Sequence, residues 1–322
     1  DIVRDIFLPW FNAYRFCIQN ITRLEKRTGD SFTFDPEMRN AVFQSSNSNY
    51  LDKYIITSTQ NMIKYVRNEM DNYRLYNVVR HLVTFLENLT NWYVRLNRSR
   101  MKGESSVEDQ RTALTILFDV LMSATQLMSP ITPFMSEYLF QNLKNGLREG
   151  DPLNVASIHF TSIPTYNEDL IDLEIEQTVE RMQTAIEVGR LCRSRAVISM
   201  KYPLAKVKLI DSDQSVLASY NKLQSYITDE LNCLELECDS NEDEYIQYRV
   251  EADNRALGKA LGKKFDKAFK AALTNLSSEQ IKGYLRDGRI EINGNEITDG
   301  MLKVIKAFKA EESKGEQRWI CE

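Results

Sequence analysis

The basic residues between positions 74 and 102 are the side chains whose type and spacing best suit a chemical role. They are Arg74, Arg80, Arg95, Arg98, Arg100 and Lys102. The only acidic residue in this stretch of 29 is Glu87, so the local charge is +5 on a chain whose net charge is -5. A local excess on an acidic chain favours contact with one polyanion over diffuse adhesion. Charge alone leaves a solvated helix face as the alternative.

A second basic cluster lies between positions 258 and 270, where five lysines outnumber Asp266. Within it we consider Lys259, Lys263 and Lys264 as possible secondary contacts for the same polyanion. A solvated face explains this cluster equally well.

The sequence offers few residues for catalysis or metal binding. It has two histidines, His81 and His159, and its five cysteines form no Cys-x-x-Cys pair. Because a Gly-rich phosphate loop is also missing, we predict neither a catalytic centre nor a metal site, and no cofactor in this chain. Scattered cysteines in odd number fit a reducing compartment such as the cytoplasm.

Length and composition describe a globular chain of about two domains. It has 322 residues, 43% hydrophobic and 27% charged. No stretch approaches the roughly 20 apolar residues of a membrane span. The opening DIVRDIFLPW has neither an initiator Met nor a signal-like segment, so we expect a piece of a longer chain.

The main basic segment is predicted to lie on one long helix, about 74–98. Its apolar residues recur every three or four positions, as expected for a core-facing stripe: Leu75, Val79, Leu82, Leu86, Leu89, Tyr93 and Leu96. The opposite face carries Asn77, Arg80, Thr84, Asn91, Arg95 and Arg98. Trp92 falls on the flank, where it either packs at the core edge or serves as a stacking platform.

The remaining periodicity predicts a mainly α protein. Helices over about 1–25, 50–72, 107–128 and 132–143, with a linker at 28–48, indicate an antiparallel bundle over residues 1–160. We predict a smaller mixed α+β domain over residues 161–322, truncated at its end. Strands are expected at 158–160, just before this domain, and within it at 205–210, 233–238, 245–250, 302–308 and 317–321. The expected helices of the domain are 170–192, 214–231, 254–274 and 278–286. The last is opened by Ser277-Ser278-Glu279-Gln280, a capping-box pattern, and a hairpin is expected at Asn293-Gly294.

Several strings resemble one known family. They are Leu8–Arg15, Asn72–Tyr76, Thr90–Arg98, Met128–Phe134, Ile198–Leu204 and Leu257–Lys259. They are similar to the anticodon-binding helical domain and following region of class I aminoacyl-tRNA synthetases, in their isoleucyl branch of eukaryotic cytoplasmic type. The resemblance covers nearly the whole chain and is weaker beyond residue 210.

The resemblance implies a function in tRNA recognition. It implies tRNA(Ile) as partner, beside the catalytic and editing domains of the same enzyme, and it allows other synthetases as further partners. ATP and Mg would serve the parent isoleucine-tRNA ligase. The family's two catalytic motifs are missing here, and the nearest strings, at Arg80-His81-Leu82 and Ser199-Met200-Lys201, lack their spacing. We therefore expect this chain alone to be inactive in aminoacylation.

The resemblance also suggests a contact surface on the basic segment. An anticodon loop offers phosphates and unpaired bases, which proteins bind with Arg, amides and planar rings. The proposed tRNA-binding residues are Arg74, Arg80, Asn91, Trp92, Arg95, Arg98, Arg100 and Lys102. Tyr76 is a further possible platform, and Arg74 could instead pair with Glu69 or Asp71.

Two other interpretations remain open at this point. The chain could be a helical protein-interaction module of a multienzyme assembly. It could also be the equivalent region of a valyl- or leucyl-tRNA synthetase.

Overall fold

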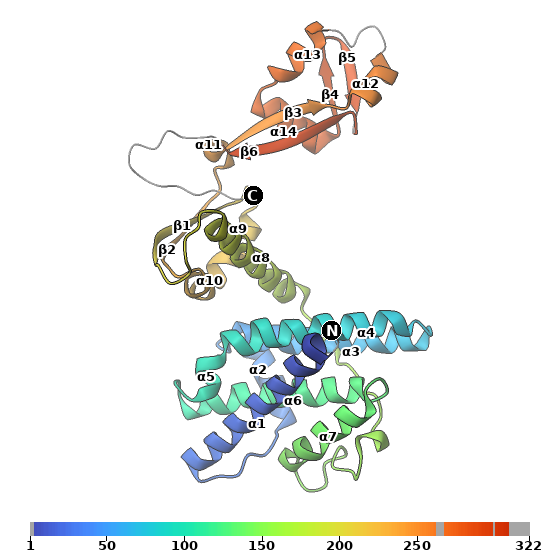
Figure 1. Ribbon diagram of the computed structural model, residues 1–322, viewed down its shortest axis with the longest axis vertical. Helices are drawn as coiled ribbons and strands as arrows, with labels where there is room; N and C mark the ends of the chain where they lie inside the picture. The colour runs from blue at the N-terminus through green and yellow to red at the C-terminus, as the bar shows by residue number, and fades with distance from the viewer. Residues whose placement is uncertain (1–2, 262–266, 299, 309–322) are drawn as a thin grey trace. The chain divides into compact units, whose positions relative to one another are not determined.

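The computed structural model describes residues 3–261, 267–298 and 300–308. The chain divides into two compact units, Asp1–Glu180 and Arg181–Glu322. Figure 1 shows a helical first unit and a second unit that combines helices with small sheets. The predicted order, a helix bundle followed by a mixed α+β part, is therefore confirmed.

The first unit is built around one buried helix, α6 (Val107–Met128). Every residue of α6 from Ala113 to Met128 is buried, so this helix is covered on all sides. The surrounding elements are η1 (Val3–Phe7), α1 (Leu8–Thr28), α2 (Pro36–Gln44), α3 (Tyr50–Asp71), α4 (Leu75–Asn88), η2 (Leu89–Val94), α5 (Arg98–Lys102) and α7 (Pro133–Leu143). Of these, α1, α2, α3, α5 and α7 pack directly on α6.

The predicted linker at 28–48 contains the helix α2. The side chain of Asp35 accepts a hydrogen bond from the backbone N–H of Glu37 at 3.2 Å, and Pro36 occupies the first turn. An Asp cap followed by Pro is a strong helix start. The abundance of Ser, Asn and Asp around it concealed this signal.

The predicted helix 74–98 contains a π-helical turn, η2, between α4 and α5. A π turn holds more residues than an α turn, so it rotates the residues that follow it. As a result Asn97 is buried while Leu96 is only half-buried. At the other end, Leu75 and Val79 are exposed, and the prediction that they face the core is wrong.

The first unit extends 20 residues beyond the predicted boundary at 160, because residues 161–180 pack on α3. Thr57 donates to the carbonyl of Leu170 at 3.0 Å, and Asn61 donates to Glu176 at 2.6 Å. The predicted strand at 158–160 is wrong. This segment forms a short 3-10 helix, η4 (Ile158–Phe160), and the carboxylate of Glu137 accepts the backbone N–H of Ile158.

The short 3-10 helix η5 (Glu168–Leu170) and the long helix α8 (Leu173–Arg195) come next, and α8 continues into the second unit. The segment between η4 and η5 is also hydrogen-bonded to α3. The guanidinium of Arg67 donates to the carbonyls of Ile163 and Pro164 at 3.1 and 3.2 Å.

In the second unit, a parallel strand pair follows the end of α8. β1 (Leu204–Ile210) pairs with β2 (Cys233–Asp239), and Leu204 lies opposite Cys233. The helix predicted between them is two helices, α9 (Gln214–Lys222) and α10 (Gln224–Leu231), with a break at Leu223. The end of α8 is held to this layer by Arg193, which is buried and donates to the carbonyls of Leu231, Ser199 and Tyr202.

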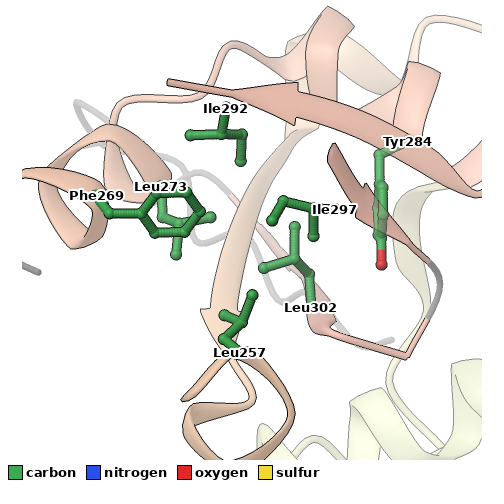
Figure 2. Close-up of a cluster of buried hydrophobic side chains, with 7 residues drawn as sticks. All are labelled: Leu257, Phe269, Leu273, Tyr284, Ile292, Ile297 and Leu302. Carbon is green, nitrogen blue, oxygen red and sulfur yellow. The ribbon is translucent and has the colours of Figure 1, made fainter. Parts of the chain in front are cut away.

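The rest of the second unit packs around a small hydrophobic core. β3 (Ile246–Ala252) pairs antiparallel with β6 (Leu302–Phe308), and β4 (Arg289–Ile292) pairs with β5 (Asn295–Thr298). The helices are α11 (Glu242–Tyr245), α12 (Asn254–Leu261), α13 (Lys267–Thr274) and α14 (Ser278–Asp287). Figure 2 shows the buried side chains of Leu257, Phe269, Leu273, Tyr284, Ile292, Ile297 and Leu302 converging from these elements.

Two local predictions in this part are confirmed. Asn293 and Gly294 have φ values of 50° and 70°, as the tight hairpin turn between β4 and β5 requires. At the start of α14, Ser277 and Gln280 form the predicted capping box. The predicted strand 317–321 lies outside the described residues.

Gly189 tests the packing of α8 on α10. A Cβ at this position would lie 2.7 Å from two methyl carbons of Leu231. We expect Gly189→Ala to destabilise the second unit by about 1–3 kcal/mol, because it overpacks this contact. Hydrogen exchange of the β1 and β2 amides measures the effect.

The matched control is Gly283→Ala in α14, where an added Cβ meets nothing within 4 Å. Ala is favoured over Gly within a helix, so this change should stabilise by about 0.5–1 kcal/mol. Stabilisation of both variants would contradict the close contact at Gly189.

Candidate nucleic-acid interface

One exposed face runs along α4, η2 and α5. Its exposed residues recur every three or four positions along the chain. They are Tyr76, Arg80, Thr84, Glu87, Asn91, Arg95, Arg98 and Lys102. We call this set the outer face. It contains four cations and one acid, and it includes five of the eight predicted tRNA-binding residues. The buried residues of the same segment, such as Leu82, Leu86, Leu89 and Tyr93, attach it to the bundle.

Helix α1 borders the outer face. The guanidinium carbon of Arg98 lies 5.7 Å from the centroid of the Phe16 ring, a cation–π distance. At the end of α1, Arg27 donates to the carbonyl of Gly103 at 3.0 Å and to Gln110 at 3.3 Å. The last turn of α1, with Lys26 and Arg27, therefore adds positive charge beside the loop that follows Lys102.

Sequence reasoning missed this contribution from α1. The pair Lys26-Arg27 at the end of a predicted helix was a visible signal, since cations are common in last turns. Its position next to residues more than 70 positions away depends on the packing of α1 against α5 and α6.

Arg100 does not lie on this surface. Only 15% of its side chain is exposed, and its guanidinium donates to Asp52 at 3.0 and 3.2 Å and to Asp109 at 2.6 Å. It also donates to Asn97 at 2.6 Å, and the Tyr93 hydroxyl donates to Asp52 at 2.8 Å. The Asp52 carboxylate, 1% exposed, thus lies in a network that joins α3, η2, α5 and α6.

This placement corrects the predicted role of Arg100. An RNA contact would take the guanidinium away from a buried carboxylate, which is costly. Burial of Arg100 disfavours its charged form, but the hydrogen bonds to Asp109 and Asp52 outweigh this and raise its pKa. The Arg100 hydrogen bond in turn lowers the pKa of Asp109, against the opposing effect of burial.

Two more predicted contacts have structural surroundings. Trp92 is buried with 9% of its surface exposed, so the core-edge interpretation fits and the platform interpretation does not. Arg74 donates to the buried carboxylate of Glu69 at 2.7 Å, one of the two pairings considered from the sequence. Neither residue belongs to the outer face.

The three lysines predicted as secondary tRNA contacts, Lys259, Lys263 and Lys264, cannot be placed on a surface. Lys263 and Lys264 lie outside the described residues, and Lys259 is a residue of helix α12. Among the residues described, no group of three or more His, Cys, Asp or Glu could hold a metal ion. None of the helices described has the length and apolar character needed to cross a membrane.

A shallow groove lies beside the outer face, between α3, α4 and residues 166–173. It is lined by Asn61, Lys64, Tyr65, Arg67, Asn68, Asp71, His81, Tyr166 and Leu173. The ring centroids of Tyr65 and His81 lie 4.1 Å apart with the ring planes tilted by 31°. Burial lowers the pKa of His81. The cation of Lys64 pairs with Glu168 at 2.9 Å. His81 is therefore a packed flank residue.

Comparison with known proteins identifies the class. Residues 52–209 match the family model described as the anticodon-binding domain of tRNA ligase. This region includes α3 from its third residue onward, α4 to α7 and the whole outer face. The chain therefore contains an anticodon-binding domain of the tRNA ligase class.

Similarity to individual proteins extends over almost the whole chain. Isoleucine--tRNA ligase of Tetrahymena thermophila is 40% identical over 315 residues, which are 98% of this chain and 29% of the relative. The cytoplasmic isoleucine--tRNA ligase of Mus musculus is 40% identical over 314 residues, 96% of this chain and 24% of the relative. A bacterial isoleucine--tRNA ligase, from Bdellovibrio bacteriovorus, is 33% identical over 311 residues, 97% of this chain and 28% of the relative.

These relatives define the particular family. The chain belongs with the isoleucine–tRNA ligases and corresponds to their anticodon-binding region. It spans less than a third of the length of the relatives that it matches.

Arg100 gives a test of the buried network. We expect Arg100→Ala to destabilise the first unit by about 3–5 kcal/mol, because it leaves the Asp52 carboxylate buried without its cation. Urea denaturation followed by the fluorescence of the buried Trp10 and Trp92 measures this change. Arg98→Ala, which removes an exposed Arg of the same segment and its contact with Phe16, should destabilise by about 1 kcal/mol or less. Equal effects of the two variants would contradict the assignment.

The network also predicts a dependence on pH. Since the pKa of Asp109 is lower in the folded state than in the unfolded chain, its stabilising effect is complete above the unfolded pKa near 4. That effect is lost as the pH falls through the folded pKa. The stability difference between the wild type and Asp109→Asn should therefore shrink below pH ~4.

Denaturation of both proteins at pH 6 and pH 3 measures this difference. Glu108→Gln, in the same helical turn, controls for the loss of one charge. A difference that widens on acidification would contradict the direction of the Asp109 shift.

Proposed function

We propose that the outer face binds the anticodon arm of tRNA(Ile). The observation that carries this proposal is the exposure of Arg80, Arg95, Arg98 and Lys102 together with Asn91 on one helical segment. The cations suit backbone phosphates, which supply affinity and position. The amide of Asn91 can both donate to and accept from the edge of an unpaired base.

The rigidity of the segment supports the same proposal. The residues behind the outer face are buried, and the Asp52–Arg100–Asp109 network ties its end to α3 and α6. Side chains on such a support lose less freedom when they bind than side chains on a mobile loop. The region would therefore orient the tRNA, whose distant acceptor end reaches an active site elsewhere in a longer protein.

We further infer the activity of that longer protein. The names and lengths of the relatives support an isoleucine-tRNA ligase of the cytoplasm that aminoacylates tRNA with ATP and Mg. Its catalytic and editing domains, and other synthetases, are the protein partners that we propose. The present chain alone would bind tRNA without aminoacylating it, because neither family motif for amino-acid activation occurs in its sequence.

Removal of two arginines tests the proposed surface. Arg95→Ala combined with Arg98→Ala should weaken binding of a tRNA(Ile) transcript and reduce the salt slope, d log K/d log [salt], by about 1.4–1.8 in magnitude. This value is expected if each arginine neutralises one phosphate. Filter binding between 50 and 200 mM salt measures both quantities.

A charge-matched control is Arg148→Ala combined with Arg286→Ala. These exposed arginines pair with Asp35 and Asp287 and lie off the outer face. An equal loss in both double variants would show only a general effect of charge and would refute the assigned surface. A transcript with a valine anticodon tests whether the recognition is specific for isoleucine.

A further inference from the structure

The turn that joins α3 to α4 exposes large apolar side chains. Tyr73 is 92% exposed, Tyr76 is 74% exposed and Leu75 is 57% exposed. Such groups gathered on one short segment usually mark a site of interaction. We call residues 72–76 the tyrosine turn.

Tyr73 has an unusual backbone conformation. Its φ of 57° lies in the left-handed region, which is disfavoured for bulky residues with a Cβ. Residues persist in this region where their surroundings hold them there, and they are found disproportionately at binding sites. A glycine would adopt the same conformation without this strain.

The tyrosine turn is held in place from its buried side. The carboxylate of Glu69, 4% exposed, accepts hydrogen bonds from the side chains of Arg74 at 2.7 Å and Asn77 at 2.6 Å. The Glu69 carbonyl accepts the backbone N–H of Arg74 at 2.8 Å, and the Met70 carbonyl accepts that of Tyr73 at 3.0 Å. The backbone of the turn is therefore fixed without help from the tyrosine rings.

The tyrosine rings make no specific contacts within the part of the chain that the structure describes. Neither the Tyr73 nor the Tyr76 side chain has a hydrogen bond or ring contact with any part of the chain that the structure describes. Tyr76 and Arg80 are four residues apart in α4, so both project from the same side of the helix. The turn thus continues the outer face at its N-terminal end.

We propose that the tyrosine turn is a stacking platform for unpaired nucleotides of the tRNA held by the outer face. This proposal rests on the function proposed above and assigns a second kind of contact to it. Aromatic rings on a rigid backbone present flat surfaces on which bases stack. Arg80 lies where it can bind the adjoining phosphate, and the exposed carboxylate of Asp71 can accept from the amino group of a base.

Two variants test the platform, Tyr73→Gly and Tyr76→Ala. Each should weaken binding of a tRNA(Ile) transcript roughly 5- to 150-fold, the range expected for the loss of one stacked base. The salt slope should stay unchanged, because no phosphate contact is removed. The melting temperature of Tyr73→Gly should equal or exceed that of the wild type, which separates lost binding from lost folding.

Substitutions that keep part of the side chain identify the chemistry. Tyr76→Phe keeps the ring and should bind as the wild type does, whereas Tyr76→Leu keeps apolar surface only and should bind as weakly as Tyr76→Ala. Binding restored by Tyr76→Leu would overturn stacking. Phe134→Ala on α7 is the matched control, because it removes another exposed ring, 90% exposed, and should leave binding unchanged.

The results also separate this proposal from the preceding one. If Tyr73→Gly and Tyr76→Ala bind normally while the Arg95 and Arg98 double variant does not, the platform is refuted and the outer face stands. If the arginine variant also binds normally, the assignment of the outer face fails as well.

Discussion

The buried Asp52 carboxylate is the constraint on which the interface depends. An ionised carboxylate inside a helix bundle is tolerated only with a cation and hydrogen bonds, which Arg100 and Tyr93 supply. Arg100 is also bonded to Asp109, so α3, η2, α5 and α6 meet at one charged centre. The exposed cations of the same segment are positioned by this centre.

The basic segment therefore divides its charges between two roles. Arg100 pairs with the buried Asp52 and the half-buried Asp109, and Arg74 pairs with Glu69. Arg80, Arg95, Arg98 and Lys102 remain exposed. The sequence alone does not distinguish which of these six cations are exposed and which are paired with acids. Only those whose helical positions point outward can contribute to a polyanion contact, and α1 adds further charge at the edge through Arg27.

Much of the fold could be predicted because its signals are local. The apolar periodicity of α3 and α6, the Asn293-Gly294 turn and the Ser277–Gln280 capping box depend on neighbouring residues only. The errors arose where distant contacts decide. Residues 161–180 belong to the first unit because they bond to α3, and the π turn η2 shifts the buried face from Leu96 to Asn97.

The sequence by itself determined the helical bundle, the mixed α+β part and the segment that carries the candidate interface. It did so because periodicity, turn chemistry and local charge are properties of short stretches. Tertiary structure alone decided which of the segment's side chains are available. Trp92 and Arg100 are buried and Tyr73 is displayed because exposure depends on partners, such as Asp52 and Glu69, brought together by folding.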